Sequence, residues 1–489
     1  MKVLLNSPGF SYDVHSLVKA FFPDEDVKIE ATGKTDEQSG YLSVYVFPED
    51  ICPDRLFSGC VRVSAGRADN RSDVTRQYRD LGRTEIKSFL KRILYETLFH
   101  ITGTALPWGT MTGIRPVKVP MKLLRQGADD GAIYDHMKSV YLCSDEKIAL
   151  ATGIAHREKR IIDSLPDDGF SLYIGIPFCP TTCMYCSFTS YPIASWAERT
   201  DEYLRALKRE LDHFCAFYDG RKPDSIYIGG GTPTTLSPDQ LTDLIGYVRQ
   251  RFDLSGLREF TVEAGRPDSI TREKLEALIS SGVDRISVNP QTMNEGTLKL
   301  IGRRHTVEDV YKAYETARSV GFSNINMDLI LGLPGEDEGD VANTFERIKE
   351  LSPDSLTVHS LAVKRASNIH EYIKEHGRSH DASAMMEIAG QCAKSLGLVP
   401  YYLYRQKNMS GNLENVGYSR EENPGIYNIV IMEEISDIAA AGAGTISKRI
   451  LDGGRIERCD NVKDVALYID RIDEMIEKKE RLWHLQKNR

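Results

Sequence analysis

Residues 173–192, YIGIPFCPTTCMYCSFTSYP, place Cys179, Cys183 and Cys186 in one short loop. The next cysteine along the chain is Cys215, far beyond this loop. A closed structural metal site normally takes four protein ligands. Three thiols gathered this closely therefore predict a metal site in which one coordination position is left open.

The sequence around this loop alternates short β-branched runs with helical segments from residue 171 to about 360. Strand-like runs cover residues 171–177, 225–230, 259–265, 283–289, 324–332 and 355–361. Six strands with intervening helices predict parallel pairing through right-handed crossovers. The periodicity fits a doubly wound open sheet equally well. Motifs at many strand ends favour a curved, partial (β/α)6 barrel, because such a barrel brings strand ends together at one mouth.

The flanking regions differ from residues 171–360 in their pattern of strand-like and helical segments, so the α/β chain is expected to have three parts. Residues 1–165 combine strand-like runs with helical segments at 83–102 and 144–165, which predicts a separate α/β accessory domain. Residues 166–398 form the predicted barrel. Residues 399–489 begin with the strand-like VPYYLYRQ and end in a charged helix, which predicts a mainly helical extension on the substrate side.

Composition excludes several classes of protein. A chain of 489 residues is longer than a single hydrophobic core usually accommodates. A composition of 41% hydrophobic and 27% charged residues is typical of globular proteins. The net charge of -9 argues against a nucleic-acid partner. No apolar run approaches the ~20 residues of a membrane-spanning helix, so a cytoplasmic protein without a membrane partner is expected. The six scattered cysteines are expected to be small buried hydrophobes.

The three clustered thiols suit iron–sulfur ligation, in which each sulfur holds one iron. Three thiolates on a four-iron cubane leave one iron open to a substrate or cofactor. The alternative is a zinc ion whose fourth ligand is a distant histidine.

A glycine run marks the end of the next strand, in IYIGGGTPTTL at residues 226–236. Gly229, Gly230 and Gly231 allow the backbone to approach a ligand closely, because no Cβ stands in the way. Such a run alone indicates only a tight turn. One βα unit after a CxxxCxxC loop, it is a specific signal.

The combination of CxxxCxxC and GGGTP resembles the radical S-adenosylmethionine (SAM) superfamily over residues 171–360. This resemblance implies a (β/α)6 partial barrel, a [4Fe-4S] cluster and SAM as cofactors. It also implies that the open iron binds the amino and carboxylate groups of SAM, which is then cleaved to a 5′-deoxyadenosyl radical.

The finer pattern resembles the oxygen-independent coproporphyrinogen III dehydrogenases. YxxIPFC, GGGTPT and DLILGLPGE match that family, and the long N-terminal region with PWGTMTGIRP and YYLYRQKNMSGNLENVGY resembles its HemZ-type branch. The resemblance implies that the three cysteines and Tyr173 are catalytic. It further implies cofactor contacts by Tyr173, Tyr185, Gly230, Gly231, Thr232, Glu263, Gln291, Arg303 and Asp328, with Arg304 an equally near alternative to Arg303.

Two positions depart from the best-known branch of this family. Gly175 stands where that branch has histidine, and Phe188 stands where it has a fourth cysteine. Both leave the three cluster cysteines intact, and they put the substrate geometry and a second SAM in doubt.

The family reaction removes a hydrogen from a propionate side chain and releases carbon dioxide, which leaves a vinyl group. Two rounds convert coproporphyrinogen III to protoporphyrinogen IX in anaerobic haem biosynthesis. A tetrapyrrole with propionates needs cationic contacts, for which the candidates are Lys364, Arg365, Arg405 and Lys407. An electron donor such as flavodoxin or ferredoxin and an unidentified electron acceptor are the other implied partners.

Two rival functions use the same barrel. One is a haem chaperone that binds haem without decarboxylation, although such proteins carry an HNxxYW-like segment where this chain reads NLENVGYS. The other is a radical methyltransferase that acts on haem.

Overall fold

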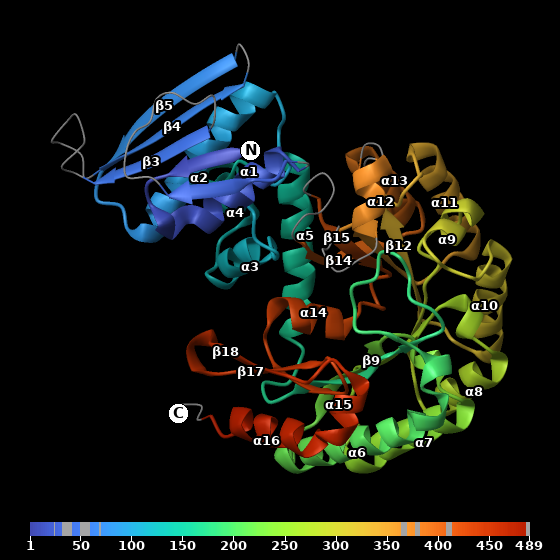
Figure 1. Ribbon diagram of the computed structural model, residues 1–489. Coiled ribbons are helices and arrows are strands. Elements are labelled where there is room, and N and C mark those ends of the chain that lie inside the picture. Colours follow the sequence, from blue (N-terminus) through green and yellow to red (C-terminus); the bar gives the residue numbers. More distant parts are fainter. Residues whose placement is uncertain are drawn as a thin grey trace. The chain divides into compact units, whose positions relative to one another are not determined.

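The computed structural model describes residues 1–23, 25–31, 42–48, 59–67, 70–362, 369–376, 382–406 and 413–485. The chain divides into two compact units (Figure 1): residues 1–156 with 404–414, and residues 157–403 with 415–489. This division differs from the expected boundaries at 165 and 398. Residues 404–414 belong to the first unit, while the rest of the expected C-terminal extension joins the second unit.

The first unit is built on a five-stranded sheet of order β2-β1-β3-β4-β5. Its strands are β1 (Lys2–Leu5), β2 (Lys28–Ala31), β3 (Leu42–Pro48), β4 (Gly59–Arg67) and β5 (Asn70–Tyr78). Strand β1 is parallel to its neighbours, whereas β3, β4 and β5 are antiparallel. Side chains alternate between the two faces: Val61 and Val63 are fully buried, and Arg62 pairs with Asp73 at 2.6 Å. The buried face packs against helix α2 (Arg83–Thr102).

The helices of the first unit are α1 (Ser11–Phe21), α2 (Arg83–Thr102), α3 (Lys118–Arg125), α4 (Asp130–Tyr141) and the first part of α5 (Asp145–Ile162). Two of them, α2 and α5, correspond to predicted segments, whereas α1, α3 and α4 were not predicted. Helix α2 coincides with the predicted segment 83–102, and it buries Leu90, Ile93 and Leu94. It ends at Gly103, which has φ of 67°, a conformation that glycine adopts readily.

The second unit contains the six predicted parallel strands. They are β6 (Phe170–Ile176), β9 (Pro223–Gly230), β10 (Glu259–Gly265), β11 (Arg285–Val288), β12 (Ile325–Leu331) and β13 (Ser355–Ser360). These strands lie side by side in chain order, and every neighbouring pair is parallel. A doubly wound sheet would reverse its strand order at a switch point. The sequential order therefore confirms the barrel-type arrangement.

The crossover helices form an arc on the outer side of this sheet (Figure 1). They are α6 (Thr200–Phe217), α7 (Pro238–Arg251), α8 (Arg272–Ser280), α9 (Glu295–Leu300), α10 (Val307–Val320) and α11 (Glu338–Leu351). Side-chain caps fix where three of them begin: Ser237 with Gln240, Thr306 with Asp309, and Asp337 with Asp340 form reciprocal capping pairs.

Strands from the C-terminal region extend both edges of the parallel sheet. Strand β16 (Asp437–Ala441) is parallel to β6, and β15 (Asn415–Ser419) is antiparallel to β13. Beyond them lie β14 (Val399–Tyr404), β17 (Ile446–Ile450) and β18 (Ile456–Asp460). The remaining helices are α12 (Ile369–His376), α13 (Ala382–Ser395), α14 (Ile426–Glu433), α15 (Val465–Asp470) and α16 (Ile472–Trp483). The mixed α/β class and the helical chain end are confirmed.

A fully buried ion pair fastens α16 to the barrel. Lys479 of α16 pairs with Glu210 of α6, and both side chains are completely shielded from solvent. Glu210 also accepts hydrogen bonds from Tyr468 and from Asn461. A buried charge is tolerated only when it is paired and hydrogen-bonded, so these contacts make α16 part of the second unit.

Candidate functional site

The three clustered cysteines lie in a loop at the carboxyl edge of β6. The short strands β7 (Phe178–Cys179) and β8 (Tyr191–Pro192) pair with each other, so both ends of residues 179–191, the cluster loop, are held together. Met184 donates its backbone N–H to Ile301 at 3.0 Å, and Arg266 donates to the carbonyl of Thr181 at 3.1 Å. The loop is thus anchored to the segments that follow β10 and β11.

The thiols of this loop are partly or fully shielded from solvent. Cys183 is buried, and Cys179 and Cys186 are half-buried. The Thr232 hydroxyl lies 3.5 Å from the Cys179 sulfur, and burial nevertheless raises the pKa of this thiol to about 11. A thiol must lose its proton to bind metal, so a cationic centre would supply the stabilisation that burial withholds.

The donor set fits an iron–sulfur cluster. Three thiols are the soft ligands that iron–sulfur clusters take, and in a cubane each thiolate holds a different iron. Among the residues that the structure describes, no three Cys, His, Asp or Glu side chains converge closely enough to hold a single metal ion.

The glycine run packs directly against the cluster loop. Gly231 donates its N–H to Ile176 at 2.8 Å, and Thr232 donates to Phe178 at 2.7 Å. A Cβ on Gly231 would lie 2.5 Å from the Phe178 carbonyl oxygen, and Gly230 has φ of 108°. Two backbone donors expected to be open to a ligand are therefore used to fasten the loop.

A row of polar side chains faces the interior of the barrel. Each is the less buried position of an otherwise buried strand: Tyr173 on β6, Tyr227 on β9, Glu263 on β10, Asp328 on β12 and His359 on β13. Sequence reasoning found Tyr173, Glu263 and Asp328 but missed Tyr227 and His359. The signal for both was a polar residue at an alternate position in a buried strand.

The carboxylates in this row have specific partners. Glu263 accepts a hydrogen bond from the Tyr227 hydroxyl at 2.6 Å and from the Gly230 N–H at 3.3 Å. Burial raises the pKa of Glu263 to about 7 despite these bonds, which lower it. Asp328 accepts from Asn326 at 2.7 Å and lies 4.0 Å from His359.

The two tyrosines of this row stack with a third aromatic ring. Tyr173, Tyr227 and Tyr427 stack on one another, with ring centroids 5.9, 5.8 and 4.7 Å apart. Tyr427 comes from α14, so the C-terminal region closes the barrel interior at this level. Tyr185 packs beside Ile301 and Ile330, and its role in lining the cofactor pocket stays a prediction.

Unpaired polar atoms lie at the carboxyl end of β11. Gln291 has φ of 70°, and its N–H donates to the Asp328 carbonyl at 3.0 Å. The side-chain oxygens of Gln291 and Asn289 are buried and have no hydrogen-bond partner among the described residues. Buried polar atoms are normally paired, so these two point to a missing ligand.

Arg303 connects this strand end to the cluster loop. Its guanidinium donates to the Asn289 carbonyl at 2.5 Å and to the Tyr185 hydroxyl at 3.0 Å. Arg303 is buried and Arg304 is exposed, which distinguishes the two neighbouring candidates. Two of the Arg303 N–H groups hold protein groups in place, whereas its buried Nε has no hydrogen-bond partner among the described residues.

Of the four predicted substrate contacts, Arg405 is the one that lies among the described residues. Lys364, Arg365 and Lys407 lie outside the described residues. Arg405 is buried in the first unit, where it donates to the Met111 carbonyl and lies 5.9 Å from the Trp108 ring. Burial lowers its pKa to about 10.

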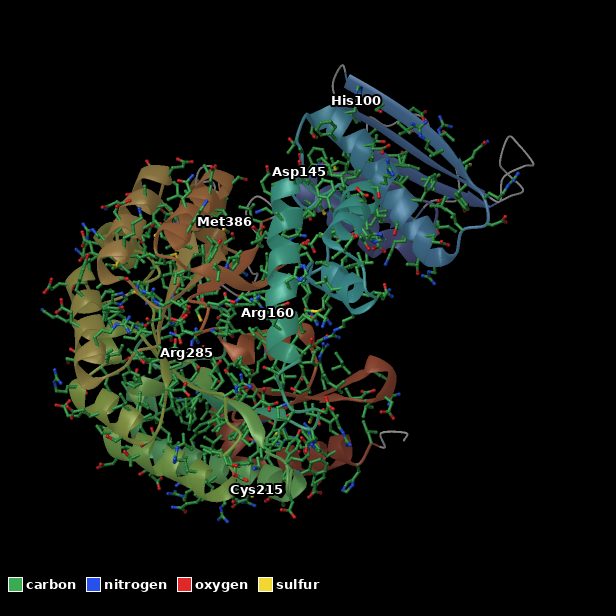
Figure 2. All side chains as sticks on the ribbon, turned by 180° about the vertical axis from the view of Figure 1, so that it is seen from behind. His100, Asp145, Arg160, Cys215, Arg285 and Met386 are labelled. Atoms are coloured by element: carbon green, nitrogen blue, oxygen red, sulfur yellow. The ribbon has the colours of Figure 1, made fainter. Side chains whose placement is uncertain are left out.

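The scattered cysteines lie apart from the cluster loop. Cys215, labelled in Figure 2, is near the end of α6, which leads into the amino end of β9, and its thiol donates to the Arg251 carbonyl at 2.8 Å. The cluster loop lies at the opposite, carboxyl edge of the strands. Cys60, Cys143 and Cys392 are buried, Cys459 is half-buried, and Cys52 is outside the described residues.

Comparison with known families matches residues 173–348 to the radical SAM superfamily. The described part of the chain has no helix long and apolar enough to cross a bilayer. The chain is 43% identical over 405 residues to the oxygen-independent coproporphyrinogen-III oxidase-like protein HemZ of Bacillus subtilis, and this match covers 81% of the chain and 80% of HemZ.

Other similarities are shorter. Heme chaperone HemW of Bacillus subtilis is 39% identical over 43% of the chain, which spans 55% of HemW. The oxygen-independent coproporphyrinogen III oxidase of Escherichia coli is 33% identical over 40% of the chain and 43% of that protein. The solved structure of the Escherichia coli enzyme HemN shares the fold, with a TM-score of 0.53 and 24% identity over 66% of this chain and 73% of HemN.

The extent of the HemZ match decides the family, because it covers most of both proteins. Radical SAM proteins use a [4Fe-4S] cluster and S-adenosylmethionine, and the three-thiol loop supplies ligands of the required kind. The chain belongs to the radical SAM superfamily and, within it, to the family of the oxygen-independent coproporphyrinogen-III oxidase-like protein HemZ.

Proposed function

We propose that this chain catalyses the oxidative decarboxylation of two propionate groups of coproporphyrinogen III, which gives protoporphyrinogen IX. The observation that carries the proposal is that the three-thiol loop follows β6, while polar side chains occupy the less buried positions of β6 and of the parallel strands β10 and β12 in the same sheet. Similarity to the oxidase-like HemZ over most of the chain supports the choice of substrate.

The residues proposed to hold the cluster are Cys179, Cys183 and Cys186. When bound, the cluster and SAM would supply a carbon radical able to remove a hydrogen atom from an unactivated C–H bond. The protein's own part is to bind, to orient and to exclude water.

The SAM pocket is proposed to lie between the cluster loop and the interior row. Glu263 is suited to accept hydrogen bonds from ribose hydroxyls, because its carboxylate lies at a strand end beside the glycine turn. The unpaired oxygens of Asn289 and Gln291 are suited to accept from N–H groups of the ligand. Gly230, Gly231 and Thr232 are proposed to shape the wall of this pocket, and Asp328 with His359 its far side.

The aromatic stack is proposed to limit how deeply a ligand enters the barrel. Tyr173 stands on the strand that leads into the cluster loop, and its ring is stacked on Tyr227 and Tyr427. A ring fixed on one side in this way positions a ligand on the other side with little loss of side-chain entropy.

A haem chaperone is the second candidate, because HemW is 39% identical over 43% of the chain. The two candidates differ in whether SAM is cleaved and the tetrapyrrole altered. Stoichiometric haem binding without formation of 5′-deoxyadenosine would identify the chaperone.

The test is an anaerobic assay of the reconstituted, reduced protein with SAM and coproporphyrinogen III. Mass spectrometry is expected to find 5′-deoxyadenosine together with monovinyl and divinyl products. Cys183→Ala should lose both outputs, whereas the matched control Cys215→Ala should retain both, because Cys215 lies at the other edge of the sheet. SAM cleavage without a decarboxylated tetrapyrrole would refute the substrate assignment.

A further inference from the structure

A cavity of about 520 Å³ lies beside the cluster loop. Thr181 and Thr182 of the loop form one part of its lining, and residues between 295 and 306 form the rest. None of the roles proposed above for SAM or the tetrapyrrole uses the exposed side chains of this lining.

The cavity lies directly beside the cluster loop, because residues of that loop form part of its lining. The Thr181 hydroxyl donates to the Gly302 carbonyl at 3.3 Å, so the loop and the turn after α9 touch directly. Arg303 lines the cavity and also donates to the hydroxyl of Tyr185, between Cys183 and Cys186. One side chain therefore contacts both the cavity and the cluster loop.

The cavity rim carries two exposed cations and one exposed carboxylate. Lys299 and Arg304 are exposed, and within the described part of the chain neither makes an ion pair. Exposed cations on nearby helices are neutralised locally, as Lys312 is by Glu308 at 3.6 Å. The acidic side chain of the lining, Glu295, accepts a hydrogen bond from the Val307 N–H at 2.7 Å.

The cavity also contains a buried imidazole without partners. His305 is 3% exposed, and neither ring nitrogen has a hydrogen-bond partner among the residues that the structure describes. Burial lowers its pKa to about 4, so at neutral pH the ring is uncharged and has one N–H to donate. A carboxylate entering from outside would find two cations, several hydroxyls and this donor.

We propose that Lys299 and Arg304, on the rim of this cavity, form the docking surface for a small acidic protein that delivers single electrons to the cluster. This inference rests on the proposed function, because an electron donor is needed only if the cluster loop holds a reducible cluster. The donor loses one electron and the cluster gains it, and no bond is formed or broken. A protein donor is favoured over a free anion because Thr181 and Thr182, which line the cavity, lie in the cluster loop between Cys179 and Cys183, where an electron has a short path to the cluster.

The test compares two reductants of the reconstituted protein, without SAM or tetrapyrrole. Reduced flavodoxin must dock, whereas dithionite is small enough to reach the cluster without this surface. Charge reversal in the double variant Lys299→Glu and Arg304→Glu is expected to slow reduction by flavodoxin about tenfold at low ionic strength. Reduction by dithionite should be unchanged.

The matched control is the double variant Arg205→Glu and Lys478→Glu. Both side chains are exposed, on α6 and α16, and neither makes an ion pair in the described ranges. It changes the net charge equally and should leave flavodoxin reduction close to wild type. The wild-type rate should fall as salt is added, and the rate of the docking variant should respond much less.

Direct binding of flavodoxin, measured by calorimetry on protein with and without cluster, provides a readout that does not depend on catalysis. Binding weakened in the docking variant and retained in the control supports the proposal. The proposal would be overturned if flavodoxin bound the docking variant and the control variant equally well. It would also be overturned if the docking variant were slowed equally with flavodoxin and with dithionite. Failure to form a vinyl product would refute the proposed substrate while leaving these results unaffected.

Discussion

Replacement of Glu263 by glutamine should remove a pH dependence of stability that this buried carboxyl creates. Burial raises the pKa of Glu263 from 4.5 to about 7. The folded protein therefore binds the proton more tightly than the unfolded chain, and stability falls as pH rises from about 4.5 to about 7. That difference corresponds to about 3 kcal/mol, lost in full above the folded-state pKa.

Glu263→Gln keeps the shape of the side chain but cannot ionise. Urea unfolding of wild type and variant at pH 4.5 and pH 8 measures the effect, because other buried acids contribute equally to both proteins. The variant is expected to gain about 3 kcal/mol relative to wild type between the two pH values. A stability difference that does not change with pH would show that Glu263 ionises normally and would refute its burial at the site.

Three further predictions rest on other contacts in the second unit. Tyr227→Phe removes the hydrogen bond that lowers the Glu263 pKa, so the fall in stability should move to higher pH in the same unfolding series. Lys479→Ala should destabilise the second unit by about 3–5 kcal/mol, because it leaves Glu210 buried and unpaired, whereas the exposed Arg481→Ala should cost little; thermal unfolding distinguishes them. Gly231→Ala should lower the iron content of the reconstituted protein, because its Cβ would meet the Phe178 carbonyl; wild-type iron loading would contradict the tight packing.

The periodic features of the fold could be predicted from the sequence. The six parallel strands and helix α2 stand out because their apolar residues recur with the period of a strand or a helix. The strands that extend the sheet at β15 and β16 were not predicted to pair there, because pairing between distant segments leaves no local pattern. The sequence also did not show that residues 404–414 belong to the first unit, for the same reason.

The candidate site was predicted unevenly. The spacing of Cys179, Cys183 and Cys186 identified the loop, because nearby ligands leave a local motif. Arg405 looked like a substrate contact beside an aromatic run, but it lies in the interior of the first unit. A sequence shows the charge of such a side chain, and only the fold shows which groups surround it.

The most direct test of the central claim is spectroscopy of the reconstituted cluster with labelled SAM. If three thiolates hold the cubane, one iron should be magnetically distinct, and electron–nuclear double resonance should detect the SAM amino nitrogen bound to it. A fourth protein ligand on that iron, or spectra that do not change when SAM is added, would contradict the account.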